Sequence, residues 1–262
     1  MKNCRILLLC AAAVAAFACT PKAHIKGTVN DAPASQITVR QMSGTSFKTL
    51  DTLKTGKDGS FSYALKVEKG QPEFVYIYYG ETRIAALLLE TGETATVSTD
   101  TLGRYMVSGS EGSESLAVVD KAYSDFLRDI LAAYPDNAQM SKIYIKHYRE
   151  SVKYVMDHPC SMTVIPVLYE TLGESPVFSQ PTDAIFFRDV ADSLKARYPQ
   201  SRYVKALQSE AQRRLKQLEL TNRLRSAADS QSGFLDVTMP DIRGEKKTLS
   251  EVEAKVILLN FW

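Results

Sequence analysis

The feature that most constrains the fold is a change in the spacing of apolar residues near residue 110. From His24 to about Ser110, apolar residues recur with a period of two in short β-rich runs that are separated by turn residues. After a spacer from Ser108 to Ser113 the period becomes that of helices. The pattern predicts an α+β chain, in which an amino-terminal antiparallel β-sandwich or barrel precedes an α-helical region.

The β-rich part divides into eight expected strands. Asp58 and Gly59 supply one hairpin turn, and further glycines punctuate the other connections. Along the fourth run, Phe61 and Leu65 fall on one face, as expected of a strand with one face on a core and the other in water. The expected strands are His24 to Val29, Gln36 to Met42, Phe47 to Leu53, Ser60 to Val67, Phe74 to Tyr79, Arg83 to Leu89, Thr94 to Ser98 and Arg104 to Val107.

Helical stripes fill the following region. Three stripes are expected to pack against partner surfaces, and a short apolar element from Met162 to Leu172 lies between the second and the third. Ser201 is a suitable N-cap for a long charged helix that we expect to end near Ala228. The stripes comprise Leu116, Val119, Tyr123, Phe126, Ile130 and Tyr134; Met140, Tyr144, His147, Tyr148, Val152 and Val155; and Phe186, Val190, Leu194 and Tyr198.

The amino terminus has the pattern of an export signal. Lys2 and Arg5 precede an apolar run that is too short to cross a bilayer comfortably, so residues 1–18 are predicted to be a signal peptide. Ala16 to Cys19 resembles a bacterial lipobox, and we therefore expect Cys19 to be lipidated and to anchor the chain through a tether of residues 19–23. The tether from Thr20 to Lys22 has no acidic residue, which favours a periplasm-facing anchor. The alternative is an ordinary signal peptide with a chance cysteine.

Charge excludes one class of partner. The formal charge of +2 comes from Lys2 and Arg5, and without these two residues 30 basic residues balance 30 acidic ones. Nucleic-acid binding needs a clustered excess of Lys and Arg. We therefore expect no nucleic-acid partner, and contact with the membrane only through the anchor.

Cysteine and histidine residues offer little for catalysis or metal binding. Cys4 and Cys10 leave with the signal peptide, so Cys160 is the one thiol expected in the mature chain besides Cys19. It is either a reactive thiol or, as we favour, a small residue near a helix start. His147 is interpreted as a packing residue, and the remaining two histidines, His24 and His158, as surface residues. No metal and no cofactor is expected.

Other motifs are equally plain. The loop from Gly109 to Gly112 lacks the features of a phosphate-binding loop, and we interpret it as a linker. The aromatic run Phe74, Tyr76, Tyr78 and Tyr79 could stack against sugars. We favour the alternative, a strand with aromatic residues on both faces.

The final thirty residues carry a family resemblance. Thr248-Leu249-Ser250 is followed by an apolar run from Lys255 that ends in Asn260-Phe261-Trp262. This pattern resembles the start of the thioredoxin-like domain of TlpA-like and ResA-like envelope thiol-disulfide oxidoreductases. One step departs, because Leu235 and Asp236 stand where that family usually has Pro-Asp. Many members of the family also place a lipoprotein signal, a β-sandwich domain of unknown function and a helical connector before the redox domain.

The resemblance implies a division of the chain and a function. Residues 24–110 would be the sandwich, 111–230 the connector and 231–262 an incomplete start of the thioredoxin-like domain, with Val256 to Trp262 a buried central strand. In the family a Trp-Cys-x-x-Cys motif follows, and no residue of this chain replaces its cysteines, so we expect a non-catalytic part of an envelope lipoprotein and not an enzyme. The alternatives are a stand-alone lipoprotein whose sandwich binds a glycan or an envelope protein, and a decayed gene product.

Overall fold

A computed structural model describes residues 22–43, 46–230, 237–253 and 258. The chain forms two compact units, Met1–Ala211 and Gln212–Trp262, and each unit is described by itself. The expected lipidation site, Cys19, lies outside the described residues, as does the expected strand from Val256 to Trp262 apart from Leu258.

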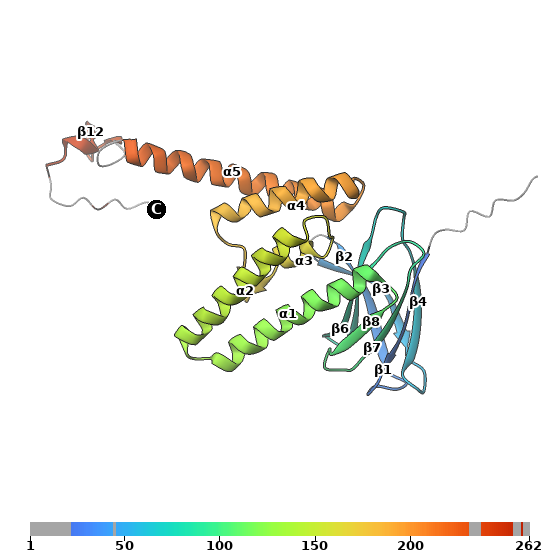
Figure 1. Cartoon of the computed structure of the whole chain (residues 1–262). Coiled ribbons are helices and arrows are strands. Elements are labelled where there is room, and N and C mark those ends of the chain that lie inside the picture. Colours follow the sequence, from blue (N-terminus) through green and yellow to red (C-terminus); the bar gives the residue numbers. More distant parts are fainter. Residues whose placement is uncertain (1–21, 44–45, 231–236, 254–257, 259–262) are drawn as a thin grey trace, which may run out of the picture. The chain divides into compact units, whose positions relative to one another are not determined.

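Eight strands form a sandwich of two four-stranded sheets, drawn in blue to green in Figure 1. One sheet has the order β4-β1-β7-β8 and the other the order β3-β2-β5-β6. Each expected strand is confirmed, with ends that differ by a residue or two. The observed strands are β1 (Lys22–Val29), β2 (Gln36–Ser43), β3 (Ser46–Lys54), β4 (Ser60–Lys66), β5 (Glu73–Tyr79), β6 (Thr82–Leu89), β7 (Thr94–Thr99) and β8 (Tyr105–Ser108).

One strand pair departs from the expected antiparallel pattern. β1 and β7 run parallel, with Ile25 opposite Ala95, so the first sheet is mixed. A parallel neighbour requires a long connection, and here the whole second sheet is inserted between β1 and β7. Local periodicity does not contain that information.

The sandwich has its own apolar interior. Ile25 and Val97 from the first sheet meet Val39, Ile77 and others from the second, and all of these side chains are at most 2% exposed. Along β4 the residues alternate as expected, with Phe61 and Leu65 buried. The interior therefore follows the predicted period of two.

Helices cover the outer face of the second sheet over β5 and β6. β5 and β6 are buried over nearly their whole length, because alternate residues point to the sandwich interior and to the helix layer. α1 contacts both β6 and β8. The helices are α1 (Glu111–Ala133), α2 (Asn137–Asp157), α3 (Val164–Leu168), η1 (Pro181–Asp183), α4 (Ala184–Arg197) and α5 (Arg202–Ser230), and a small hairpin of β9 (Thr171–Leu172) and β10 (Ser175–Pro176) follows α3.

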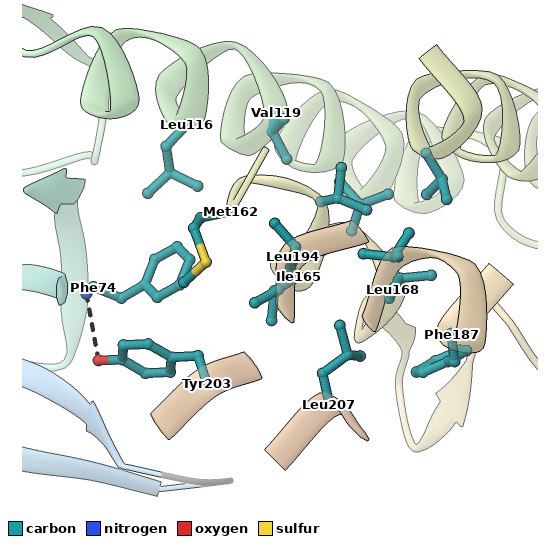
Figure 2. Close-up of a cluster of buried hydrophobic side chains, with 14 of the residues drawn as sticks. Phe74, Leu116, Val119, Met162, Ile165, Leu168, Phe187, Leu194, Tyr203 and Leu207 are labelled. Atoms are coloured by element: carbon teal, nitrogen blue, oxygen red, sulfur yellow. Dashed lines mark hydrogen bonds between the residues drawn. The ribbon is translucent and has the colours of Figure 1, made fainter. Parts of the chain in front are cut away.

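A second apolar core joins the sheet to the helices, as Figure 2 shows. Phe74 from β5 packs against Leu116 of α1, Met162 and Tyr203, and the rings of Phe74 and Tyr203 meet edge to face at a centroid distance of 4.9 Å. The backbone N–H of Phe74 also donates to the Tyr203 hydroxyl at 3.4 Å. Sandwich and helices are thus one packed structure up to Ala211.

The junction between β8 and α1 corrects the interpretation of residues 109–112 as a linker. Ser110 caps α1, and its hydroxyl oxygen lies 3.1 Å from the Leu88 carbonyl oxygen. Ser113 is fully buried and binds the same carbonyl at 2.9 Å. A Cβ atom on Gly112 would lie 3.0 Å from that oxygen, so a larger residue would require its neighbours to shift by a few tenths of an ångström. The junction is fixed, because the hydroxyl groups of Ser110 and Ser113 both contact the backbone of the neighbouring strand β6.

The helix α5 begins in the core of the first unit. Val204, Leu207 and Ala211 are buried there, whereas Leu215 and Leu218 on the same stripe are only partly buried. The second unit also contains a hairpin of β11 (Thr238–Pro240) and β12 (Lys246–Thr248), followed by η2 (Leu249–Glu251). Among the described residues no helix is both long and apolar enough to span a membrane.

Candidate functional site

A polar groove of about 590 Å³ lies in the first unit where sheet and helices meet. It is bounded by the end of β6, the start of α1, the turn after α2 and the end of α4. This is the groove that brings Cys160 and His158 together with charged residues. Its titratable lining consists of Glu90, Glu93, Glu111, Asp157, His158, Cys160, Arg197 and Tyr198.

Helix ends position the side chains of this groove. His158 directly follows α2 as its C-cap, and its Nδ1 lies 3.0 Å from the Tyr154 carbonyl oxygen while its ring stacks on the Tyr154 ring at 4.3 Å. Tyr198 directly follows α4 as its C-cap and donates its hydroxyl to Glu90 at 3.2 Å. Arg197 lies over the Tyr198 ring at 5.2 Å. These contacts hold the rims of the groove in place.

The groove carries more acidic than basic groups. Glu93 accepts hydrogen bonds from the Ser110 hydroxyl at 2.9 Å and from the Glu90 backbone N–H at 2.8 Å. A hydrogen bond from Lys153 lowers the pKa of Asp157, so that carboxylate stays ionised in this surface position. Burial raises the pKa of the Tyr198 hydroxyl. The excess of carboxylates suits a ligand that donates hydrogen bonds. Among the described residues, however, no base contacts the Cys160 thiol.

A second polar cluster is buried between α1, α2 and the residue before β9. His147 Nε2 lies 2.8 Å from Glu170 Oε2, and the Ser151 hydroxyl lies 3.4 Å from both atoms. The His147 ring stacks on Phe126 with centroids 4.0 Å apart and planes 4° from parallel. Burial is the main reason why the pKa of Glu170 is raised, and the hydrogen bond from His147 opposes that effect.

The composition of this cluster is that of a Ser-His-acid triad, but its geometry is not. In a triad the serine and the acid engage opposite nitrogens of the imidazole, so that a proton can be taken on one side and the ring held on the other. Here Ser151 and Glu170 both meet Nε2. All three side chains are also buried, which leaves no room for a substrate. The cluster is structural, in agreement with the interpretation of His147 as a packing residue.

The outer face of the second sheet presents a third cluster. Arg83 pairs with Asp120 of α1, and Asp120 also accepts the Tyr105 hydroxyl at 3.1 Å. Burial raises the pKa of Tyr105 and that of Tyr76. Together these contacts tie α1 to β6 and β8.

The sequence-based site residues are only partly brought together. His24 and His158 are exposed, as predicted, and Cys160 is an exposed free thiol in the turn between α2 and α3. The aromatic run of β5 does lie on both faces of its strand, with Phe74 and Tyr76 buried under the helices. Sequence reasoning missed Glu170 as the partner of His147, because the pair is separated by 23 residues and joined only by the fold.

Metal binding has no support in the described ranges, where no group of three or more His, Cys, Asp and Glu side chains has a suitable arrangement.

Residues 23–116 match the family model of a domain of unknown function (DUF4369), a domain that occurs in thioredoxin-like lipoprotein families. The match covers the sandwich from Ala23 onward and ends at Leu116, inside α1. No curated protein matches the sequence significantly.

Proposed function

We propose that this chain is the amino-terminal, non-catalytic part of a lipid-anchored envelope protein of the thioredoxin-like thiol-disulfide oxidoreductase family. The observation that carries the proposal is the DUF4369 match over residues 23–116, a domain of thioredoxin-like lipoproteins. The resemblance of Lys255 to Trp262 to the first strand of a thioredoxin-like domain supports it from the other end of the chain.

In this proposal the first unit is a stiff mount. Its sandwich and helices share one core, and the junction at Ser110 and Ser113 is bonded to β6 and not left as a flexible connection. Tyr203 at the start of α5 is fixed to β5, since its hydroxyl lies 2.8 Å from Glu73 Oε2. An anchor at Cys19 is followed after a short tether by β1, so the mount begins next to the membrane.

The proposal is tested on the native protein, purified from its own membranes, by intact mass and by its carboxy-terminal peptide. We expect a lipid on Cys19 and a mass larger by a thioredoxin domain, on the order of 100 residues, that contains a Cys-x-x-Cys motif. A lipidated species that ends at Trp262 would contradict the assignment to an oxidoreductase. An unmodified Cys19 would contradict the anchor.

A pair of cysteine variants sharpens the anchor test. Cys19→Ala should abolish lipid labelling and release the protein from the membrane fraction. Cys10→Ala is the matched control, because Cys10 lies inside the same predicted signal peptide but does not follow small residues at a cleavage site. Equal labelling of both variants would refute Cys19 as the modified residue.

A further inference from the structure

We propose that the outer face of the second sheet binds a sugar ring at a surface formed by Arg40, Phe47, Tyr78 and Glu81, which we call the Phe47 patch. The buried aromatic residues of β5 do not form it. Its exposed ring comes from β3, and its charges come from β2 and from the turn between β5 and β6.

Phe47 is the exposed apolar surface of the patch. Its residue is 45% exposed, although its ring packs edge to face against Tyr76 at 5.1 Å and against Tyr78 at 6.2 Å. The two tyrosines fix the orientation of the ring, so its outer surface is presented without loss of side-chain freedom upon binding. A rigid, exposed aromatic surface is suited to the flat C–H face of a pyranose.

Arg40 and Glu81 supply polar groups beside that ring. The Arg40 guanidinium lies over the Tyr78 ring at 4.2 Å, which fixes its plane. Its Nη2 is 3.7 Å from Glu81 Oε1, too long for a strong hydrogen bond, and the Glu81 side chain is 94% exposed. The Arg40–Glu81 ion pair is therefore weak, and both the guanidinium and the carboxylate can still form hydrogen bonds with a ligand.

The chemistry of the pair selects the class of ligand. Arginine only donates hydrogen bonds and a carboxylate only accepts them. A ligand that meets both beside an aromatic ring needs neighbouring groups that donate and accept, and adjacent sugar hydroxyls do this.

The charged end of the patch lies away from the amino-terminal end of β1. The chain enters β1 at Lys22, whose carbonyl oxygen accepts the Gly92 N–H at 3.1 Å, beside the end of β6. Tyr78 and Glu81 lie at the other end of the β5–β6 pair, where Tyr78 is opposite Arg83. At about 3.4 Å per residue, the five steps from Glu73 to Tyr78 place Tyr78 about 17 Å from that end, whereas Phe47, which pairs with Met42, enters the patch from nearer to it.

The test uses the full-length chain in detergent and a defined set of probes, namely the hexasaccharides of cellulose, xylan, mannan, laminarin and chitin. Titration calorimetry should detect binding of at least one probe. Glu81→Ala should weaken it by about threefold to tenfold, and Phe47→Ala by about tenfold or more. Glu81 is almost fully exposed, so its variant will fold whatever its role.

Matched controls lie elsewhere on the sandwich. Glu68→Ala removes an exposed carboxylate that pairs with Lys66 at 3.2 Å, and Met106→Ala removes a 74% exposed apolar side chain of β8. Both should bind like the parent protein. The inference is wrong if no probe binds, if binding survives in both patch variants, or if an unstructured peptide library binds at Phe47 while the sugars do not.

This inference does not depend on the proposed function. A protein that lacks a redox domain could still bind a sugar here, and a failed titration would leave the mass and lipid measurements unaffected. The two experiments therefore fail separately.

Discussion

Removal of Glu170 should destabilise the first unit strongly. Its carboxylate and the His147 ring are each more than nine-tenths buried and lie 2.8 Å apart. Glu170→Ala leaves the imidazole N–H buried without its acceptor, and an unsatisfied buried donor of this kind typically costs about 1–3 kcal/mol. Because whole domains are stable by only about 5–15 kcal/mol, the loss is a large fraction of the total.

The measurement is urea unfolding followed by far-UV circular dichroism of the parent protein, of Glu170→Ala and of a double variant. His147→Phe combined with Glu170→Leu should restore most of the stability, to within about 1.5 kcal/mol of the parent, since a phenyl ring can keep the flat stack on Phe126 and no charge remains buried. Glu150→Ala, on the same helix as His147, is the control. Its exposed ion pair with Lys146, at 3.8 Å, contributes at most about 1 kcal/mol to the free energy of unfolding.

The pH dependence gives an independent check of the sign. Burial raises the pKa of Glu170 in the folded state, so the folded protein keeps a proton that the unfolded chain has already lost. The free energy of unfolding must therefore fall as pH rises from about 4.3, the ordinary value for Glu, to the raised value. Glu170→Gln should remove that fall. A cost below about 1 kcal/mol for Glu170→Ala, or an unchanged pH profile in Glu170→Gln, would refute the account of a buried, mutually dependent pair.

Two further changes test the contacts that hold sandwich and helices together. Tyr203→Phe removes a hydroxyl that lies 2.8 Å from Glu73 Oε2 and 3.2 Å from the Met42 carbonyl oxygen, and should cost about 1–3 kcal/mol in urea unfolding; an unchanged midpoint would show that water replaces it. Gly59→Ala should lower the melting temperature, because Gly59 has φ of 78° and a Cβ there would lie 2.3 Å from the Val29 carbonyl oxygen; Gly70→Ala, with φ of 73° but open space around it, should cost less.

The strands could be predicted because the alternation of apolar and polar residues within each strand, and the turn residues between strands, are local features of the sequence. Phe61 and Leu65 alternate with exposed residues, and Asp58-Gly59 supplies a turn in which Asp58 accepts the Ser60 N–H at 3.0 Å. The sequence also indicates that a further layer covers the second sheet, because β5 and β6 are apolar on both faces and such strands are buried on both sides. What periodicity could not supply was the identity of that cover.

Contacts between distant residues account for what sequence reasoning missed. The parallel pairing of β1 with β7 joins residues about seventy positions apart, and nothing in either strand specifies its direction. His147 and Glu170 likewise meet only after α2 and α3 have folded back on α1. Ser110 and Gly112 looked like linker residues because small polar residues serve both flexible loops and tight junctions, and burial alone distinguishes the two.

The two proposals use different parts of the second sheet. Its inner face is buried in the sandwich core. Most of its outer face is buried against the helices, through Phe74, Tyr76, Ala86 and Leu88. Among the described residues of this sheet, those near Phe47 combine an exposed aromatic ring with an arginine whose ion pair is long, at 3.7 Å. Because the ring and the guanidinium are both held by β5 tyrosines, the covered part of the sheet supplies the rigidity that the uncovered corner needs in order to bind a ligand at low entropic cost.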